Sequence, residues 1–285
     1  MHQTTLGKTG EPIPAIGFGG MPLSIKGRPP EEQGIRVIQA AIDAGMTLID
    51  TADVYCLDDS DIGHNERLIA KAIRGREGVR VATKAGLRRP RGAWVNDGSP
   101  KRIREACEQS LRSLETEQIW LYQFHAPDPR VAFEKSVEAF AELHREGKFQ
   151  WFGVSNVSVE QLEQANRILP VQSVQNRLNP YFRESIDVAQ ECAKRGVTFL
   201  AYSPVGGGRL AKKLPKFEVL QDIARAHSSS VHAVTIAWVR TQAETVVPIP
   251  AARTIEHATD SARAAELELT EEEIRRIDET EFDRT

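Results

Sequence analysis

The chain has 285 residues, of which 40% are hydrophobic and 27% charged, as in an ordinary globular protein, and its net charge of −3 gives no reason to expect nucleic acid or a membrane as partner. No apolar run approaches the roughly 20 residues that a membrane helix needs, and the amino terminus lacks the apolar segment of a secretory signal. Three widely spaced cysteines argue against a disulfide framework or a zinc site, so we expect a soluble cytoplasmic protein with reduced thiols.

Short β-rich segments alternate with longer segments of helical period along the chain. A hairpin is predicted first, over Thr4–Ile16, with Gly7 and Gly10 as turn residues. The eight segments that follow with strand character are Ala15–Gly20, Thr47–Asp50, Val79–Lys84, Ile119–His125, Phe149–Ser155, Ser173–Asn176, Thr198–Tyr202 and Thr245–Ile249.

Between the strands, helix caps and apolar spacing predict helices. The helical segments are Glu32–Ala44, Pro100–Leu114 after the cap Ser99, Val131–Glu146 before Gly147, a helix opened by Ser158 and Gln161, Glu184–Arg195 before Gly196, and Glu271–Thr280 opened by Thr270 and Glu273. Three longer irregular segments follow strands, namely Cys56–His64, Leu87–Gly98 and Val205–Phe217.

Eight strands that each precede helical sequence predict a closed (β/α)8 TIM barrel, with the amino-terminal hairpin closing its bottom. The alternative is a doubly wound open sheet. Gly17-Phe18-Gly19-Gly20 lacks the third glycine of a dinucleotide-binding fingerprint, which argues against that alternative. No polar or proline-rich linker divides the chain, so residues 1–285 are predicted to form a single domain.

Polar residues end the predicted strands, and barrel closure would bring them together at one mouth. Asp50 ends the second strand with Tyr55 just beyond it, Lys84 ends the third, and His125 ends the fourth. Singly, each residue is more often structural, since a strand-end lysine usually extends to water. Four such residues from three neighbouring strands favour a shared site over coincidence.

The charges of these four residues indicate proton donation to a carbonyl group. A free tyrosine has a pKa of about 10, and an ammonium group against its hydroxyl favours the phenolate and lowers that pKa. Asp50 is the carboxylate that can hold a buried Lys84, and a neutral His125 can hydrogen-bond a substrate oxygen. Because the set includes no electron source, a hydride donor is needed, which implies a nicotinamide cofactor.

The remaining strand ends suit such a cofactor. Ser155, Asn156 and Gln175 can hold a carboxamide, and the Tyr202 ring can stack on a nicotinamide. The glycine-rich segment Gly206–Arg209 after the seventh strand is suited to wrapping a pyrophosphate, in the region where barrels commonly bind phosphate.

Over nearly its whole length the chain resembles the aldo-keto reductase family. The matching segments are G-F-G-G-M at Gly17–Met21, D-T-A-D-V-Y at Asp50–Tyr55, T-K at Thr83–Lys84, F-H-A-P-D at Phe124–Asp128, G-V-S-N at Gly153–Asn156, V-Q-N at Val174–Asn176, A-Y-S-P at Ala201–Pro204 and V-P-I-P at Val247–Pro250. The resemblance implies a catalytic tetrad of Asp50, Tyr55, Lys84 and His125, with Tyr55 as proton donor, and ordered binding of NADPH before an aldehyde or ketone is reduced to an alcohol.

The resemblance also implies the cofactor contacts. They are Gly20, Met21, Asp50, Ser155, Asn156, Gln175, Tyr202, Ser203, Pro204, Val205, Gly206, Arg209, Ile249, Ala251, Arg253, His257 and Ser261. Arg253 is the clear basic candidate for a 2′-phosphate, because His257 and Ser261 stand where many relatives have arginine and asparagine. NADPH is therefore the preferred cofactor and NADH the alternative. Cys56, where many members have glycine, is read as a small buried thiol.

The substrate is expected to be a small carbonyl compound, bound by Met21, Leu23, Tyr55, Trp94 and His125. The chain ends soon after its last predicted helix, so the long carboxy-terminal segment that closes the pocket in some relatives is expected to be absent and the specificity loose. No metal site is expected, since the acidic segment Cys56–Glu66 lacks a calcium-loop pattern. A monomer or weak homo-oligomer is predicted.

Two other functions fit parts of the sequence. One is a nicotinamide-binding redox sensor or regulatory subunit, as the potassium-channel β-subunits of this family are. The other is an aldolase that forms a Schiff base on Lys84, but Asp50 is expected to keep that lysine protonated.

Overall fold

The computed structural model describes residues 1–284, and Thr285 lies outside the described residues. A single domain over residues 1–285 stays a prediction. Its centre is one sheet of eight strands, in the order β12 (Val246–Ile249), β11 (Thr198–Tyr202), β10 (Val171–Arg177), β9 (Phe149–Ser155), β8 (Ile119–Phe124), β5 (Arg80–Ala85), β4 (Leu48–Asp50) and β3 (Phe18–Gly19). All neighbouring strands are parallel.

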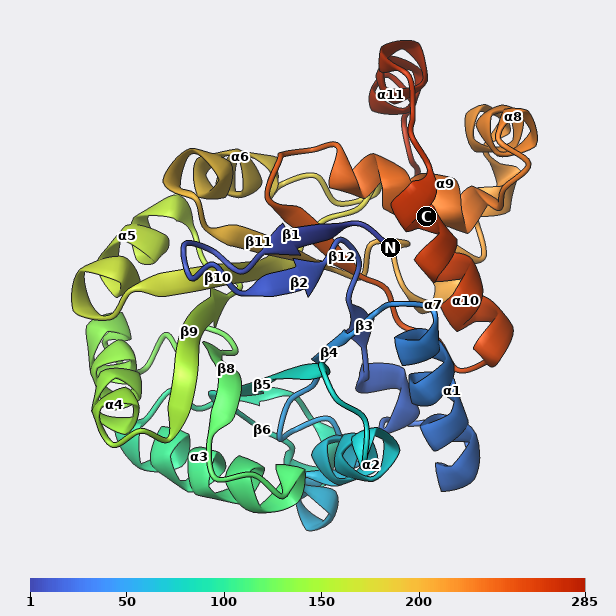
Figure 1. Ribbon diagram of the computed structural model, residues 1–285. Helices are drawn as coiled ribbons and strands as arrows, with labels where there is room; N and C mark the ends of the chain where they lie inside the picture. The colour runs from blue at the N-terminus through green and yellow to red at the C-terminus, as the bar shows by residue number, and fades with distance from the viewer. Residues whose placement is uncertain (285) are drawn as a thin grey trace.

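Two backbone hydrogen bonds join the edge strands β3 and β12. The Gly17 N–H donates to the Pro248 carbonyl at 3.0 Å, and the Gly19 N–H donates to the Pro250 carbonyl at 2.8 Å. The sheet thereby closes on itself, and helices surround it (Figure 1). The predicted (β/α)8 barrel is confirmed. The first strand is shorter than the predicted Ala15–Gly20, because only two of its residues pair regularly with β4.

Eight helices follow the strands in turn. They are α1 (Glu31–Asp43), α2 (His64–Ile73), α3 (Pro100–Leu114), α4 (Phe133–Arg145), α5 (Val159–Ile168), α6 (Ile186–Arg195), α9 (Val231–Arg240) and α10 (Ile255–Arg263). The predicted caps are present: the Ser99 hydroxyl accepts from the Arg102 N–H, and Ser158 and Thr270 form capping boxes. Gly196 ends α6 with φ 61°, a conformation that favours glycine.

Additional elements interrupt the regular alternation. The segment Leu87–Gly98 contains a small antiparallel pair, β6 (Leu87–Arg88) and β7 (Val95–Asn96), which the sequence pattern did not reveal. Between β11 and α9 lie α7 (Gly208–Ala211) and α8 (Glu218–Ala226), and α11 (Glu271–Asp278) follows the barrel. Figure 1 shows α8 and α11 projecting from one side of the ring.

The amino-terminal hairpin covers one end of the barrel, as predicted. Its strands β1 (Gln3–Thr5) and β2 (Pro12–Pro14) pair antiparallel, and Figure 1 shows them lying across the opening. The Gly7 N–H donates to Thr198 Oγ1 at 2.8 Å, which ties the hairpin turn to the first residue of β11. Thr198 Oγ1 in turn donates to the Thr5 carbonyl at 3.0 Å. The hairpin therefore sits where the barrel strands begin.

The barrel interior changes from apolar to polar along β4, β5 and β8. Near the hairpin it is filled by an apolar cluster: Leu6, Ile13, Leu48, Ala82, Leu121, Leu200, Val247 and Ile249. Side chains two residues apart on a strand point to the same face. Two residues beyond Leu48, Ala82 and Leu121 stand Asp50, Lys84 and Gln123. The polar residues at the strand ends thus form the next layer inside the barrel.

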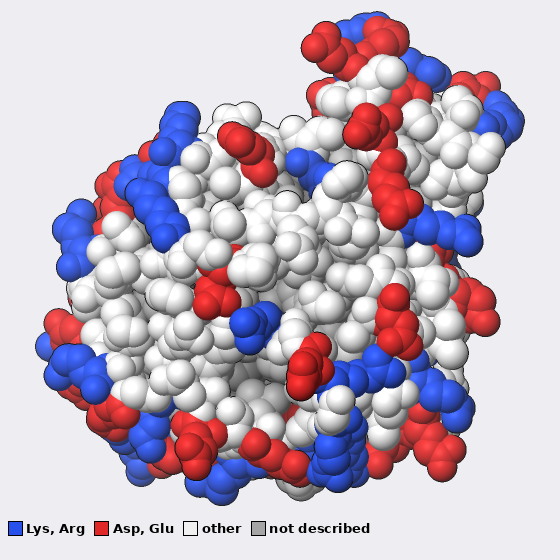
Figure 2. Space-filling model, viewed as in Figure 1, with Lys and Arg blue, Asp and Glu red and all other residues white. Residues whose placement is uncertain are grey.

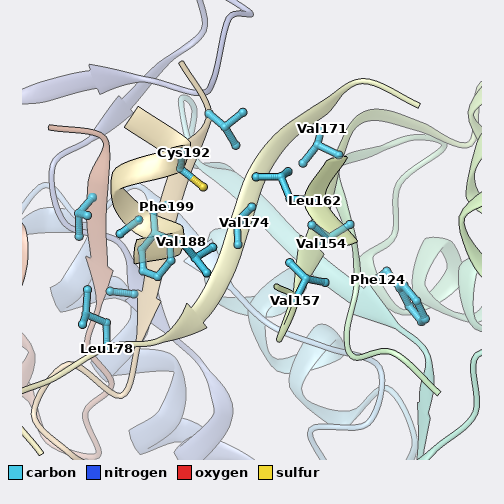
Figure 3. Close-up of a cluster of buried hydrophobic side chains, with 14 of the residues drawn as sticks. Phe124, Val154, Val157, Leu162, Val171, Val174, Leu178, Val188, Cys192 and Phe199 are labelled. Carbon is cyan, nitrogen blue, oxygen red and sulfur yellow. The ribbon is translucent and has the colours of Figure 1, made fainter. Parts of the chain in front are cut away.

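The outward faces of the strands and the inward faces of the helices form the larger core. Figure 3 shows part of it, where Val154 and Val174 of β9 and β10 lie near Leu162 of α5. Phe199 of β11 packs beside Val188 and Cys192 of α6 in the same cluster. Cys192 therefore behaves as a small apolar side chain, and burial raises the pKa of its thiol to about 12.

On the hairpin end of the molecule, charged side chains of both signs are mixed around the rim, and Figure 2 shows no large area of one sign on this face. Among the described residues, every helix is too short or too polar to cross a membrane.

Replacing Leu6 tests whether the hairpin stabilises the barrel by filling its interior at that end. The Leu6 side chain is fully buried in the barrel interior, so Leu6→Ala should lower the free energy of unfolding by about 2–5 kcal/mol. Urea denaturation followed by circular dichroism measures this change. Lys8→Ala, in the exposed turn of the same hairpin, is the matched control and should change stability by about 0.5 kcal/mol or less. Equal changes in unfolding free energy for the two substitutions would contradict this stabilising role of the hairpin.

Candidate active site

A fully buried lysine organises the carboxyl ends of the strands. Lys84 Nζ lies 2.8 and 2.7 Å from the two carboxylate oxygens of Asp50 and 2.7 Å from the Thr51 carbonyl. It also lies 3.1 Å from the Tyr55 hydroxyl oxygen. Burial lowers the pKa of Lys84, and the carboxylate of Asp50 opposes that shift. A buried ammonium surrounded by these oxygens stays charged when its partners remain in place.

Two glutamine side chains hold Asp50 from the other side. Gln175 Nε2 donates to Asp50 Oδ1 at 2.7 Å, and Gln123 Nε2 donates to the same oxygen at 3.4 Å. Sequence reasoning missed Gln123, although it lies on β8 two residues before His125, which directly follows that strand. Gln175 was predicted to hold a carboxamide, but its Nε2 is engaged by Asp50 in this structure.

Tyr55 is held in a closely packed environment. Its ring makes edge contacts with Trp94, at 6.3 Å between centroids, and with His125, at 5.8 Å. Burial, followed by the nearby charge of Asp50, raises the pKa of Tyr55 well above its usual value. The prediction of a net lowered pKa is thus wrong for this structure, because desolvation of the phenolate and the carboxylate behind Lys84 outweigh the ammonium group.

His125 is neutral, as predicted. Burial lowers the pKa of its imidazole well below the usual value, and the charge of Lys84 adds to the effect. Nδ1 is buried without a hydrogen-bond partner among the described residues. A buried N–H without an acceptor is costly, so we assign the proton to Nε2. The backbone carbonyl of His125 accepts from Asn156 Nδ2 at 2.9 Å, which links β8 to the end of β9.

A second group of buried charges lies behind the tetrad, and sequence reasoning gave it no role. Arg102 Nη2 of α3 donates to Asp53 Oδ2, and Thr83 Oγ1 donates to Glu66 Oε1 at 2.6 Å. Burial raises the pKa of Asp53 to about 6 and that of Glu66 to about 7. Asp53 shares its strand end with Asp50, but nothing in the sequence shows that a helix residue as distant as Arg102 pairs with it.

The predicted carboxamide residues lie together at the ends of β9 and β10. The Ser155 hydroxyl donates to the Gln175 carbonyl at 2.6 Å, and Asn156 Oδ1 accepts from the Tyr202 hydroxyl at 2.9 Å. Asn156 and Ser203 adopt left-handed backbone conformations, with φ 57° and 51°. Such conformations in residues other than glycine are strained and gather at functional sites, which fits a ligand at this edge.

The segment after β11 also fits a phosphate-bearing ligand. Gly206, Gly207 and Gly208 all have positive φ, at 82°, 69° and 36°, so larger side chains would be strained there. Consecutive backbone N–H groups of this kind form concave anion sites. Arg209 is exposed, and its Nη2 donates to the Arg284 carbonyl at 2.7 Å. Pro204 and Val205 form the first part of this segment.

The sequence predicts that Arg253 binds the 2′-phosphate, but in the structure its side chain is bound to backbone carbonyls. Its Nε donates to the Pro22 carbonyl at 3.1 Å and its Nη2 donates to the Lys26 carbonyl at 3.2 Å, so it fastens the segment after β3 to the segment after β12. Ala251 and His257 are exposed nearby in the chain, and the Ser261 hydroxyl donates to the His257 carbonyl at 2.9 Å. Ile249 ends β12 in the interior.

The predicted substrate residues divide into two groups. Met21 packs beside the small apolar cluster of Ala52, Val54, Tyr55 and Leu87, and Trp94 is 47% exposed against Tyr55. Leu23, by contrast, is 1% exposed and packs in the core with Phe18 and Val37. The structure therefore removes Leu23 from the lining, because the short helix η1 (Met21–Leu23) turns it inward. Gly20 is buried just before that helix, and an added Cβ would lie 2.4 Å from Asn65 Oδ1.

Cys56 is an inert thiol. Its Sγ lies 3.3 Å from each of the Val54 and Asp58 carbonyls, and burial raises the pKa of the thiol to about 12. Among residues 1–284, groups of three His, Cys, Asp or Glu side chains suited to a metal ion are absent.

One cavity lies beside the tetrad rather than over it. Its volume is about 720 Å³. Asn156, Asn176 and Tyr202 line it together with residues from the segments that open α5 and α6. Of the predicted cofactor residues, Asn156 and Tyr202 thus face open space of ligand size.

The model of the aldo/keto reductase family matches residues 15–281. The chain belongs to the aldo/keto reductase family. It is therefore an oxidoreductase, as the sequence resemblance predicted.

Individual relatives of this aldo/keto reductase cover nearly its whole length. A probable aldo-keto reductase 1 from Glycine max is 31% identical over 305 aligned residues, which cover 95% of this chain and 86% of the relative. The crystal structure of the thermostable aldo-keto reductase Tm1743 with epalrestat has a TM-score of 0.82 at 32% identity and covers 98% and 99% of the two chains. An aldo-keto reductase from Klebsiella pneumoniae, solved with NADP and acetate, has a TM-score of 0.82 at 28% identity, covering 98% and 95%.

The buried Glu66 predicts a pH dependence of stability. Its folded pKa of about 7 lies above the ordinary value of 4.5, so the folded state binds the proton more tightly and stability is lost as pH rises toward 7. Between pH 5 and pH 8 this carboxyl should cost about 2 kcal/mol of unfolding free energy. Glu66→Gln should remove most of that loss, as measured by urea unfolding at both pH values. An unchanged difference between the two pH values would show that Glu66 does not titrate in this range.

Proposed function

We propose that this aldo/keto reductase uses NADPH to reduce small aldehydes and ketones to alcohols, with Tyr55 as the proton donor. The observation that carries the proposal is the contact of 3.1 Å between Lys84 Nζ and the Tyr55 hydroxyl, made by a lysine whose other partners are Asp50 and the Thr51 carbonyl. The ammonium group then lies where negative charge develops when Tyr55 gives up its proton.

NADPH, when bound, supplies the hydride that reduces the carbonyl carbon. Tyr55 holds the proton that passes to the carbonyl oxygen. Lys84 stabilises the phenolate left on Tyr55, and Asp50 keeps the ammonium group in position. His125, with its proton on Nε2, donates a hydrogen bond to the same carbonyl oxygen and orients the substrate. A water molecule returns a proton to Tyr55 after the alcohol leaves.

The high pKa of Tyr55 is consistent with this role. A phenol with a strongly raised pKa stays protonated throughout the neutral range, so the proton is always present at the site. Displacement of water by the substrate and cofactor increases the effect of Lys84 on the developing phenolate, because charges interact more strongly in a site of low dielectric constant.

The structure disfavours Lys84 as a Schiff-base nucleophile. Three oxygens of Asp50 and Thr51 lie within 2.8 Å of Nζ, which favours the charged amine and leaves no lone pair for attack on a carbonyl carbon.

For the cofactor we propose Ser155, Asn156 and Gln175 as carboxamide residues, Tyr202 as the stacking ring, and Gly206 with Arg209 at the pyrophosphate. NADPH is preferred over NADH because Arg253, in the segment after β12, carries a guanidinium group that can bind a phosphate. Relatives from Klebsiella pneumoniae were also solved with NADP and with NADPH. Binding of the 2′-phosphate would exchange the Pro22 and Lys26 carbonyls for a stronger, charged partner.

A fluorescence titration with NADPH and NADH tests the cofactor. Arg253→Ala should weaken NADPH binding by about 10- to 100-fold, while NADH binding changes by about threefold or less, since a charged hydrogen bond to phosphate contributes roughly 1.5–3 kcal/mol. Equal losses for the two nucleotides would indicate that Arg253 only fastens the segment after β3. Failure of either nucleotide to bind the wild-type protein would overturn the cofactor assignment.

Tyr55→Phe tests the proton donor. The substitution removes the hydroxyl but keeps the ring contacts with Trp94 and His125, so NADPH affinity should stay within about threefold while kcat for a small aldehyde falls by about 10²- to 10⁴-fold. Turnover is followed by the loss of NADPH absorbance. Near wild-type kcat in this variant would remove Tyr55 from the mechanism.

A further inference from the structure

Arg89 is a buried cation beside the proposed active site that the reduction mechanism does not use. It follows β6, in the segment that continues from β5 and Lys84. The residue is 5% exposed, and its Nη2 donates to the Cys56 carbonyl at 3.1 Å and the Leu57 carbonyl at 3.3 Å. These two contacts fix the guanidinium group against the backbone just after Tyr55.

The remaining donors of Arg89 are unused. Nε and Nη1 are buried and have no hydrogen-bond partner among the described residues. No described carboxylate lies within ion-pair distance of the guanidinium group, and the nearby Asp59 carboxylate instead accepts from the backbone N–H of Arg89 at 3.1 Å. A buried guanidinium group with two unpaired nitrogen donors is unfavourable, so the fold maintains this arrangement at a cost in stability.

Two residues that contact the guanidinium group, Cys56 and Trp94, are also adjacent to Tyr55. Cys56, whose carbonyl accepts from Arg89, is the next residue in the chain. Trp94, whose ring lies 3.8 Å from Arg89 Cζ, makes the edge contact with the Tyr55 ring. One face of the Trp94 ring covers Arg89. The Trp94 side chain is nevertheless 47% exposed to solvent. The cation therefore lies at the side of the proposed substrate site, beneath an exposed ring.

We propose that Arg89 is a recognition site for a carboxylate on the substrate, so that the preferred substrates are oxo acids, which are aldehydes or ketones that carry a carboxylate group. Trp94, whose ring lies over the guanidinium group, moves aside when the carboxylate pairs with Nε or Nη1. The carbonyl group of the same molecule then lies at Tyr55. This inference rests on the proposed function, because it assigns the substrate class of the same site.

The surroundings favour a group of single negative charge. The segment after Tyr55 also carries Asp58, Asp59 and Asp61, and Asp61 is paired with Arg28 at 2.5 Å. Of these carboxylates, Asp59 accepts from the backbone N–H of Arg89 at 3.1 Å, so a doubly charged phosphate at Arg89 would be repelled more strongly than a carboxylate. A carboxylate also matches the planar guanidinium group.

Two substrates of nearly equal shape test the proposal. They are 4-carboxybenzaldehyde and its neutral ester, methyl 4-formylbenzoate, each assayed with NADPH at pH 7. In the wild-type protein, kcat/KM should be about 10- to 100-fold higher for the acid than for the ester, mainly through a lower KM. In Arg89→Gln that acid-to-ester ratio should fall to about one, and Arg89→Lys should restore part of it because the charge remains.

Arg88→Gln is the matched control, because it removes the same charge from the neighbouring residue, whose side chain is exposed and paired with Asp97. There the acid-to-ester ratio should stay within about twofold of the wild-type value, since screened surface charges contribute little. Circular dichroism confirms that each variant is folded.

Equal kcat/KM for the acid and the ester in the wild-type protein, or the same ratio in Arg89→Gln as in wild type, would overturn the proposal. Either result with continued turnover of the ester leaves the reductase function intact. Absence of turnover for both compounds together with absence of NADPH binding would instead overturn the proposed function itself.

Discussion

The ion pair between Lys84 and Asp50 is the interaction on which the site depends. Two charges in the barrel interior are tolerated only because their oxygens and hydrogens are nearly all paired, with the Thr51 carbonyl, Gln175 and Tyr55 completing the set. Removing one partner leaves the other charge uncompensated in the buried interior. The pair therefore requires a rigid barrel around it. The barrel in turn fixes the Tyr55 hydroxyl 3.1 Å from Lys84 Nζ and the His125 imidazole against the Tyr55 ring.

The strand period explains how the chain builds this pair on an apolar support. Leu48, Ala82 and Leu121 fill the barrel near the hairpin, and a step of two residues on each strand brings Asp50, Lys84 and Gln123 into the next layer. The apolar layer and the hairpin beneath it seal the ion pair from solvent on that side. Access from water is left at the opposite end, where the segments after the strands lie.

Much of this could be predicted from the sequence, because it depends on local signals. Strand period, helix caps and strand-end residues gave the barrel, the hairpin and the group of Asp50, Tyr55, Lys84 and His125. What escaped prediction depends on long-range packing. The pairing of Asp53 with Arg102 and the inward turn of Leu23 arise from how helices lie on the barrel, which no periodicity encodes. The pKa of Tyr55 was misjudged because it depends on the balance between desolvation and two opposite charges.

The hydrogen bonds that join β3 to β12 and close the sheet have a consequence for folding during synthesis. These strands contain the first and last residues of the barrel sheet, and the carbonyls of Pro248 and Pro250 are the acceptors that complete it. While the chain emerges from the ribosome, β3 has β4 on one side and no neighbour on the other. Domains fold as units once their elements are available, and long-range pairing is slow to form. Asp50 and Lys84 are therefore synthesised early, but the barrel around them can close only after β12 has been synthesised.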